Sequence, residues 1–507
     1  MKKSSVLTAA LGVAIGVLIT LVVQLWSRPA KMRVRDRDWQ KINLILKSID
    51  DNYVDSVDHR KVTDVIAEAA LQALDPHSIY MVPESLEAHE EDLAGNFDGI
   101  GIQFNVPNDT AIVLEVIPGG PSEKVGLKTG DRLLKVDSTN IAGVKFPQDS
   151  MVRRMKGKAG SKVSVLVKRD KELIPFEITR GKIPTHSVDA SFMVKDSIGY
   201  IRLSKFSRTT GHEFISATSE LIDSGLKDLI VDLRDNSGGF LDQALILSNL
   251  FLPKDSLIVY MEGRHRKRED FKADGRGPLQ SVGLSLLIDE NTASSSEIFA
   301  GAMQDNHRAT IVGRRSYGKG LVQEPLYFSD GSGMRITVAR FHTPSGRCIQ
   351  KPYTEDYNYE VLKRYNEGEM VVADSMKIEK GGIIPDVFVP IDTTRAGSFY
   401  LACNKKATTM RFASAYFDSH KEELSNIGNF DALTRYLDQA ELESKFLEFA
   451  KRKDGISPSS KEWAVDRKYI MTQLRALVGR YSKLGDNAYY HLVLEIDDCF
   501  NAALDSL

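Results

Sequence analysis

Residues 291–323 read NTASSSEIFAGAMQDNHRATIVGRRSYGKGLVQ, and this stretch decides the kind of core that the chain forms. It follows a polar turn and a short apolar run at residues 284–288, which is typical of a buried strand. From Glu297 onward, small and apolar residues recur at helical spacing. The pattern predicts a strand, a turn and a helix that begins with three serines. Unpaired backbone N–H groups and the helix dipole favour an anion at such a position.

A serine and a lysine in this stretch can form a catalytic pair. Ser294 lies at the predicted turn, and Lys319 lies 25 residues later between two glycines. A serine hydroxyl needs a neighbouring base, and lysine is that base in one class of serine hydrolases. The lysine must then be neutral, and lowering its pKa from about 10.4 to about 7 costs roughly 4–5 kcal/mol. Burial away from carboxylates would supply this shift.

Both residues also have a purely structural interpretation. Residues 294–297 match a capping box, in which Ser and Glu side chains bond the first turn of a helix. Residues 313–320 are one position short of a phosphate-binding loop, which needs Ser or Thr where this chain has Gly320. The nucleotide interpretation is therefore disfavoured, and the catalytic interpretation depends on further residues.

A Gly-Gly turn upstream supplies such residues. Residues 227–234 read as a strand, and Asp235-Asn-Ser-Gly-Gly239 separates it from a helical pattern. Glycines at a strand end can present free backbone N–H groups. We predict that amides of Gly238, Gly239 and Ser295 form an oxyanion hole. The alternative is a plain turn, which this sequence would form anyway.

Together these motifs resemble the carboxyl-terminal processing peptidases, or tail-specific proteases, of the Ser-Lys type. The resemblance implies Ser294 as the nucleophile, Lys319 as the base and Gln323 as the residue that orients the lysine. Ser295 stands where the family has alanine, so an exchange of roles with Ser296 stays open. The resemblance covers about residues 35–390 and rests on the order and spacing of Leu74-Asp-Pro-His-Ser-Ile-Tyr80, residues 235–242 (with Ser237 for the usual proline), Thr292-Ala-Ser-Ser-Ser-Glu297, Tyr317-Gly-Lys-Gly320, Thr343-Pro-Ser-Gly-Arg347 and Gly381-Gly-Ile-Ile-Pro-Asp386.

Residues 96–181 change to short β-like runs separated by Gly and Pro turns, and this pattern resembles a PDZ domain. The resemblance implies that the loop of Gly99, Ile100, Gly101 and Ile102 binds a terminal carboxylate through backbone amides. The bound peptide would add a strand to the sheet edge. A helix that carries Met151, Val152 and Met155 would line the groove for an apolar terminal side chain. The alternative is that these three side chains are simple core residues.

We therefore expect an α/β and α+β multidomain fold. It consists of a crotonase-like αβ peptidase core at residues 182–391 with an inserted PDZ β-domain at residues 96–181, a helical N-terminal region at residues 31–95 and a helical C-terminal extension at residues 392–507. Alternating strand and helix patterns in the core predict parallel pairing. Acyl-CoA chemistry, known from crotonase-type enzymes, is disfavoured because the chain shows no nucleotide-binding signature. The extension could dock on the core, mediate assembly or bind an adaptor.

The first 30 residues are predicted to be a signal anchor. Residues 6–26 carry no charge, and at 1.5 Å each they span about 32 Å, close to the bilayer core. A cleaved signal peptide is the alternative, although residues 27–30 form a poor cleavage site. More basic residues follow the segment than precede it, which would keep the remainder in the cytoplasm. The resemblance implies instead a bacterial inner-membrane anchor with the catalytic part in the periplasm, or export.

The composition of the chain limits the kinds of partner that we expect it to bind. A net charge of −2 with 42% hydrophobic residues is globular and gives no signal for nucleic acid. Three distant cysteines, Cys348, Cys403 and Cys499, make neither a disulfide framework nor a metal site, so we expect no metal and no cofactor. The predicted function is a serine endopeptidase that recognises apolar C-terminal tails and cleaves envelope or periplasmic proteins, with an adaptor or a second copy as further partners. The alternative is a membrane-anchored PDZ scaffold whose peptidase fold is inactive.

Overall fold

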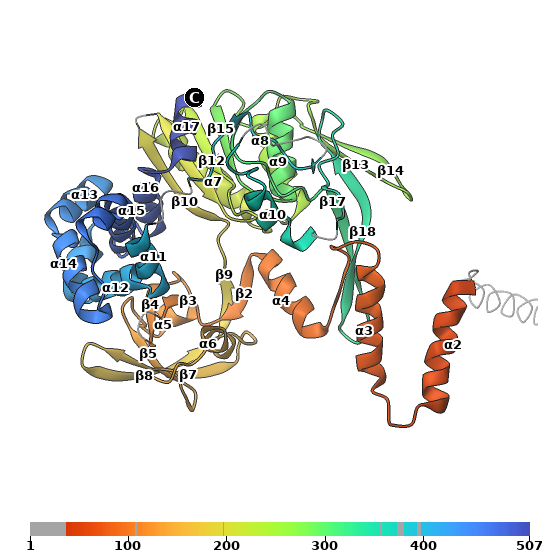
Figure 1. Cartoon of the computed structure of the whole chain (residues 1–507), viewed down its shortest axis with the longest axis horizontal. Coiled ribbons are helices and arrows are strands. Elements are labelled where there is room, and N and C mark those ends of the chain that lie inside the picture. The colour runs from red at the N-terminus through yellow and green to blue at the C-terminus, as the bar shows by residue number, and fades with distance from the viewer. Residues whose placement is uncertain (1–36, 107–108, 196, 355–356, 373–379, 393–396) are drawn as a thin grey trace, which may run out of the picture. The chain divides into compact units, whose positions relative to one another are not determined.

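The computed structural model describes residues 37–106, 109–195, 197–354, 357–372, 380–392 and 397–507 (Figure 1). It divides into two compact units that meet in sequence at Ala69 and Ala70. The first unit contains α2 (Arg37–Asn52) and most of α3 (His59–Gln72), and its side chains Trp39 and Leu44 are exposed. The predicted anchor at residues 1–30 lies outside the described residues. Among the helices that are described, none is long and apolar enough to cross a bilayer.

A six-stranded sheet forms the centre of the second unit. The β10–β11 pair is antiparallel and every other pair is parallel. Leu229 and Val231 of one central strand pack into one layer, whereas Ile230 packs into the other. Because the sheet is covered on both faces, consecutive residues of this strand are all buried, which explains the apolar run from Leu229 to Val231. In spatial order the strands are β10 (Val188–Lys195), β11 (Ile198–Leu203), β12 (Asp228–Asp232), β15 (Gly283–Ile288), β16 (Thr310–Gly313) and β19 (Val387–Phe388).

Helices cover both faces of this sheet. On one face lie α7 (Thr210–Asp223), α8 (Leu241–Phe251) and α9 (Ser295–Asp305), which bury Phe214, Phe251 and Phe299 completely. On the other face lies α17 (Asp498–Ser506) (Figure 1). Its Phe500 packs with Tyr200 of the sheet. The helix α17 therefore packs into the core of the central sheet, although 300 residues of sequence separate these two side chains.

A second, antiparallel sheet adjoins the first. Its strand order is β1 (Ile79–Met81), β18 (Gly333–His342), β13 (Leu257–Gly263) and β14 (Arg266–Lys272), and β17 (Leu321–Tyr327) also pairs with β18. The pairing of β17 with β18 shifts register between Val322 and Gln323. Such irregularities change the direction in which a side chain points, and they occur often next to active sites. Beyond β18 lie η1 (Tyr357–Tyr359) and α10 (Glu360–Asn366).

The inserted β-domain has its own sheet and core, in agreement with the prediction. The helix α4 (Pro83–Ala94) leads into β2 (Asn96–Gly99), which pairs with β9 (Gly181–Pro184) to form a two-stranded stem. Between them lie β3 (Ile102–Asn105), β4 (Ala111–Val116), α5 (Pro121–Lys124), β5 (Arg132–Val136), β6 (Thr139–Asn140), α6 (Gln148–Met155), β7 (Lys162–Arg169) and β8 (Glu172–Thr179).

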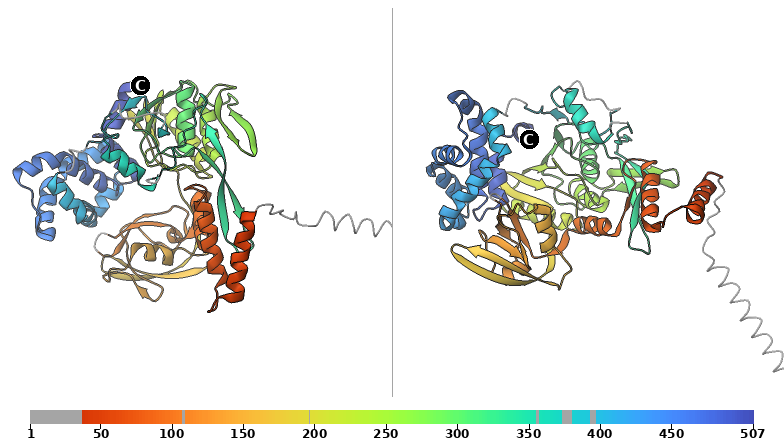
Figure 2. Two further views of the ribbon diagram at one scale, coloured as in Figure 1. Left: turned by 45° about the vertical axis from the view of Figure 1, so that its right-hand side comes forward. Right: turned by 60° about the horizontal axis from the view of Figure 1, so that its bottom comes forward.

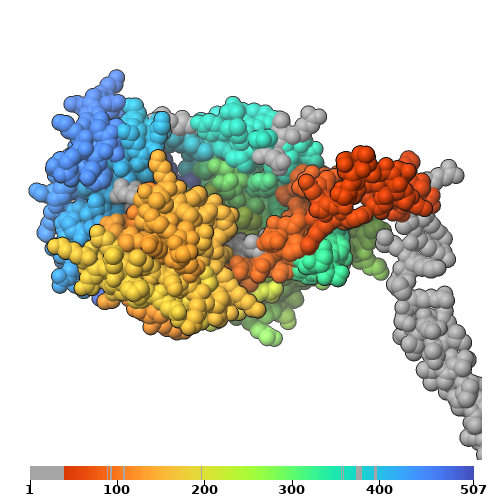
Figure 3. Space-filling view, turned by 90° about the horizontal axis from the view of Figure 1, so that it is seen from below, coloured from red at the N-terminus to blue at the C-terminus, as the bar shows by residue number. Residues whose placement is uncertain are grey.

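The C-terminal extension is a helical bundle (Figure 2). It has its own apolar core around Phe417, Phe446 and Ile470. It docks on the central six-stranded sheet, where Arg234 and Asp497 form an ion pair of 2.7 Å. It also touches the β-domain, whose surface meets the bundle in Figure 3 and whose Arg132 pairs with Asp418. Its elements before α17 are α11 (Ser398–Lys405), α12 (Thr408–Asn426), α13 (Phe430–Gln439), α14 (Leu442–Phe449), η4 (Ala450–Asp454), α15 (Ser460–Gly479) and α16 (Asp486–Leu494). The architecture confirms the predicted fold class.

Candidate active site

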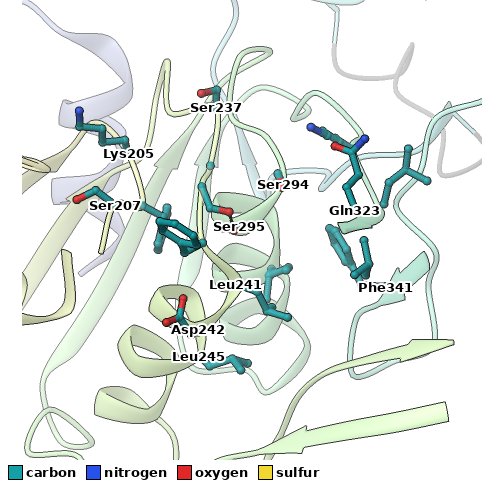
Figure 4. A pocket seen from close by; sticks show the side chains of 18 of the residues that line it. Lys205, Ser207, Ser237, Leu241, Asp242, Leu245, Ser294, Ser295, Gln323 and Phe341 are labelled. Carbon is teal, nitrogen blue, oxygen red and sulfur yellow. Dashed lines mark hydrogen bonds between the residues drawn. The ribbon is translucent and has the colours of Figure 1, made fainter. Parts of the chain in front are cut away.

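A cavity of about 940 Å³ lies between α8, the start of α9 and the β17–β18 hairpin (Figure 4). The cavity is lined by all six residues that were predicted from the sequence to act in catalysis: Gly238, Gly239, Ser294, Ser295, Lys319 and Gln323. They come from three segments that are far apart in sequence. The structure thus brings together the predicted nucleophile, base, orienting residue and oxyanion donors.

Ser294 occupies the turn between β15 and α9 with an unusual backbone. Its φ of 57° and ψ of −116° lie in a region that side-chain-bearing residues rarely adopt, and such strain costs of order 1–3 kcal/mol. The next two serines are engaged elsewhere. Ser295 Oγ donates to Gly239 O at 2.8 Å, and the fully buried Ser296 donates to Asn236 O at 3.1 Å. These bonds favour Ser294 over Ser296 as the nucleophile.

The Gly-Gly turn lies directly against the nucleophile. A Cβ added to Gly238, whose φ is +94°, would lie 2.6 Å from Ala293 O and 2.8 Å from Ser294 Cβ. Only glycine allows this approach. The Gly238 N–H donates to Asn236 Oδ1 at 2.9 Å, so this amide already has a partner within the turn. Gly239 is exposed and lines the cavity, so its amide and that of Ser295 are the better candidates for an oxyanion hole.

Lys319 is half-buried in the same cavity. Burial lowers the pKa of Lys319 from its ordinary value of 10.5, and the nearby Arg335 guanidinium lowers it further. The carboxylates of Glu297 and Asp75 oppose this shift without reversing it. The environment therefore moves the lysine in the direction that a general base requires.

Glu297 has a role that the sequence analysis missed. Its fully buried carboxylate accepts from Ser294 N and Lys319 N at 2.8 Å each, from Gly318 N at 2.7 Å and from Ser316 Oγ at 2.5 Å. Burial raises the pKa of Glu297. One carboxylate thus joins the turn of the nucleophile to the turn of the base. The capping pattern reveals the first of these bonds, but nothing local in the sequence reveals the others.

Gln323 lies on β17 at the register shift. Its Nε2 donates to the backbone carbonyl of His77 at 2.5 Å, which ties it to the turn before β1. The family resemblance assigned Gln323 to the lysine, and both residues line the cavity. The contact with His77 was not predicted.

The predicted peptide site of the β-domain is partly core. Met151 and Met155 are 0% and 4% exposed and pack inside the domain, whereas Val152 of the same helix is half-buried. In the loop of residues 99–102, the carbonyls of Ile100 and Gly101 accept from Ser122 N and Ile117 N. β3 follows this loop and is the end strand of its sheet, so one edge of it is not paired within the sheet.

Within the described ranges, no group of three or more His, Cys, Asp or Glu side chains is arranged to hold a metal ion.

Comparisons with known proteins identify related families, sequences and structures. Residues 197–361 match peptidase family S41, residues 99–179 match the PDZ domain, and residues 399–482 match a family of unknown function. The carboxy-terminal processing protease CtpA of Bacillus subtilis (strain 168) is 32% identical over 318 residues, which cover 62% of this chain and 67% of that protein. A probable CtpA-like serine protease of Staphylococcus haemolyticus is 32% identical over 312 residues, 61% of this chain and 62% of its own length. This chain thus spans less than two thirds of the staphylococcal relative. Among solved structures, a photosystem II D1 C-terminal processing protease is 27% identical with a TM-score of 0.39 over 69% of this chain and 86% of its own.

Proposed function

The chain belongs to the PDZ-containing carboxy-terminal processing proteases of peptidase family S41, and on that premise we propose that it is a serine endopeptidase that selects proteins by their C-terminal tails. The observation that carries this proposal is the meeting of Ser294 and Lys319 in one cavity, with Gly239 beside them.

In the proposed reaction, the neutral Lys319 amine accepts the proton of the Ser294 hydroxyl, and Oγ attacks the scissile carbonyl carbon. The N–H groups of Gly239 and Ser295 donate to the oxyanion that forms. Lys319 then gives its proton to the leaving amine as the C–N bond breaks. Water hydrolyses the acyl-enzyme by the same steps, with Lys319 as the base, and restores the serine.

Apolar side chains around the nucleophile suit an apolar substrate residue next to the scissile bond. Leu241 and Leu245 of α8 and Phe341 of β18 line the cavity (Figure 4). Ile298 of α9 lines it as well. Burying one such side chain contributes roughly 1.5–3 kcal/mol, enough to select among peptides.

The tail itself would bind in the PDZ domain. We place its carboxylate at the loop of residues 99–102, its backbone along the edge of β3 and its apolar terminal side chain near Val152, which is half-buried on α6. We propose that the chain acts on proteins of the bacterial envelope, with residues 1–30 as an inner-membrane anchor and the catalytic part in the periplasm or exported. The uncharged residues 6–26 support the anchor, and the family resemblance supports the location.

The test compares peptides that differ only in their last three residues. Full-length protein in detergent is incubated with each peptide, and products are identified by mass spectrometry. We expect wild-type protein to cleave peptides with apolar tails, and Ser294→Ala and Lys319→Ala to give background cleavage. Tail-dependent cleavage by Ser294→Ala would contradict the assignment of the nucleophile. Tail binding by the wild type without any product would favour a PDZ scaffold with an inactive peptidase fold.

A further inference from the structure

Residues 74–80, Leu-Asp-Pro-His-Ser-Ile-Tyr, form a motif that the proposed reaction does not use. They run from the end of α3 into β1, on the side of the cavity where Gln323 reaches His77. We propose that the turn of residues 75–78 is a positioning element that fixes the side-chain amide of Gln323 so that its oxygen is available to Lys319. This inference rests on the proposed function, because it gives the turn a role in the same reaction.

The turn is rigid because one buried carboxylate holds it together. Asp75 Oδ1 accepts from His77 N at 2.8 Å and from Ser78 N at 2.7 Å, and Oδ2 accepts from Ser78 Oγ at 2.7 Å. An aspartate that bonds backbone amides two and three residues ahead is a local alternative to regular secondary structure. Asp75 is 8% exposed and Ser78 is 1% exposed, so water competes little for these bonds.

The turn is also fixed to the strand opposite Gln323. Thr337 N on β18 donates to Ser78 Oγ at 3.2 Å, and Thr337 is the register partner of Gln323 across the β17–β18 pair. Next along the chain, Ile79 begins β1, which pairs with the same strand. On its other side the turn is anchored by a contact between His77 Nε2 and the Tyr357 hydroxyl. The position of the His77 carbonyl is therefore set from both sides.

This carbonyl settles which way the Gln323 amide faces. A glutamine side chain has a donor end and an acceptor end, and a carbonyl can only accept. Because Nε2 donates to His77 O at 2.5 Å, the reversed amide would place two oxygens against each other. The remaining end, Oε1, is the acceptor that Gln323 can offer to Lys319 Nζ inside the cavity that both line. An amine that donates to Oε1 is held with its lone pair in a defined direction.

The imidazole of His77 is not the active part of this arrangement. Burial, and next the Lys319 charge, lower the pKa of His77 to about 4, so the ring is neutral at neutral pH. The backbone carbonyl of this residue carries the effect, which is why the side chains that hold the backbone are the ones to change.

A double-mutant cycle tests this inference with full-length protein and the apolar-tailed peptide. The variants are Asp75→Ala, Gln323→Ala and their combination, and kcat and KM are measured for each. Asp75→Ala removes the three hydrogen bonds that hold the turn, so we expect kcat to fall at least about tenfold. KM should change by less than about twofold, because the turn does not hold the substrate. If the turn acts through Gln323, the double variant should lie within about twofold of Gln323→Ala alone.

Two further variants keep the result decisive. Asp75→Asn retains the Oδ1 acceptor and removes the charge, so it should retain most activity; a loss as large as that of Asp75→Ala would assign the effect to charge and overturn the inference. Ser78→Ala replaces Asp75→Ala in the cycle if the latter loses its cooperative thermal transition. The inference would also be overturned if the double variant lost activity by the full product of the two single losses, whether the turn variant is Asp75→Ala or Ser78→Ala. In that case an active wild type and an inactive Ser294→Ala would leave the proposed function standing. A wild type without activity would remove the proposed function itself.

Discussion

Replacing Glu297 by glutamine or alanine should loosen the connection between the nucleophile and the base. In the wild type, Oε2 accepts from the backbone amides of Ser294 and Lys319, and Oε1 accepts from Gly318 N and Ser316 Oγ. A glutamine retains only one accepting oxygen. The NH₂ group of the glutamine fits best in place of Oε1, beside Ser316, because the Ser316 hydroxyl can rotate to accept from it. The Gly318 N–H, which also bonded Oε1, then has no acceptor.

The magnitude follows from counting these donors. One buried N–H without a partner costs about 1–3 kcal/mol, which corresponds to roughly 5- to 150-fold if it all appears in kcat. The alanine variant removes all four bonds, including both that join the two turns, so we expect a loss of at least about 4 kcal/mol shared between activity and stability. Ser316→Ala removes one donor to Glu297 and leaves both backbone amides of Ser294 and Lys319 paired, so it serves as the matched control, with an expected effect on kcat of about 1 kcal/mol. It also removes the acceptor of the buried Ile383 N–H, so we expect an additional loss in stability.

The assay measures kcat and KM on the apolar-tailed peptide, together with the midpoint of thermal unfolding for each variant. We expect kcat to decrease in the order Ser316→Ala, Glu297→Gln, Glu297→Ala, with smaller changes in KM. Wild-type kcat in both Glu297 variants would refute the reasoning, because it would show that the two turns keep their geometry without the shared carboxylate.

Three further predictions concern the turn beside the nucleophile, the base and the docked helix. Gly238→Ala places a Cβ 2.8 Å from Ser294 Cβ and should reduce kcat and lower the unfolding free energy by about 2 kcal/mol, measured by denaturant titration; an unaltered enzyme would contradict the close approach. Because Lys319 acts when neutral, kcat/KM should rise with pH through its lowered pKa, and Arg335→Gln should raise that pKa and move the rising limb to higher pH. A shift to lower pH would show that Arg335 does not act on the base in this way. Phe500→Ala removes a ring that is 4% exposed beneath the central sheet, and the cavity should destabilise the protein by about 3–5 kcal/mol. An unchanged denaturation midpoint would argue against docking of α17.

The catalytic stretch was predictable because its signals are local. A buried strand, a polar turn and a serine at a helix start occupy a short stretch of neighbouring positions, and the Gly-Gly turn has the same kind of local pattern. Their meeting in one cavity follows from the parallel pairing of β12 with β15 and β15 with β16, which places the ends of these strands at the same edge of the sheet.

Other features depend on tertiary contacts and could not be read from sequence. Glu297 looks like an ordinary cap because its bond to Lys319 crosses 22 residues of chain. Met151 and Met155 recur at helical spacing, and that spacing is the same for a face in a core and a face along a groove. The hydrogen bond from Gln323 to His77 spans 246 residues, and it depends on a register shift that no local sequence pattern predicts.

The strained backbone at Ser294 lowers the stability of the folded protein at the position of the proposed nucleophile. At φ 57° and ψ −116° a serine carries strain of about 1–3 kcal/mol, whereas glycine adopts these angles freely. A Ser294→Gly protein would gain part of that energy, less the roughly 0.5–1 kcal/mol by which glycine loosens the unfolded chain. Under the proposed mechanism such a protein would be inactive and yet more stable, so the strained serine lowers stability at the position where the reaction needs a hydroxyl.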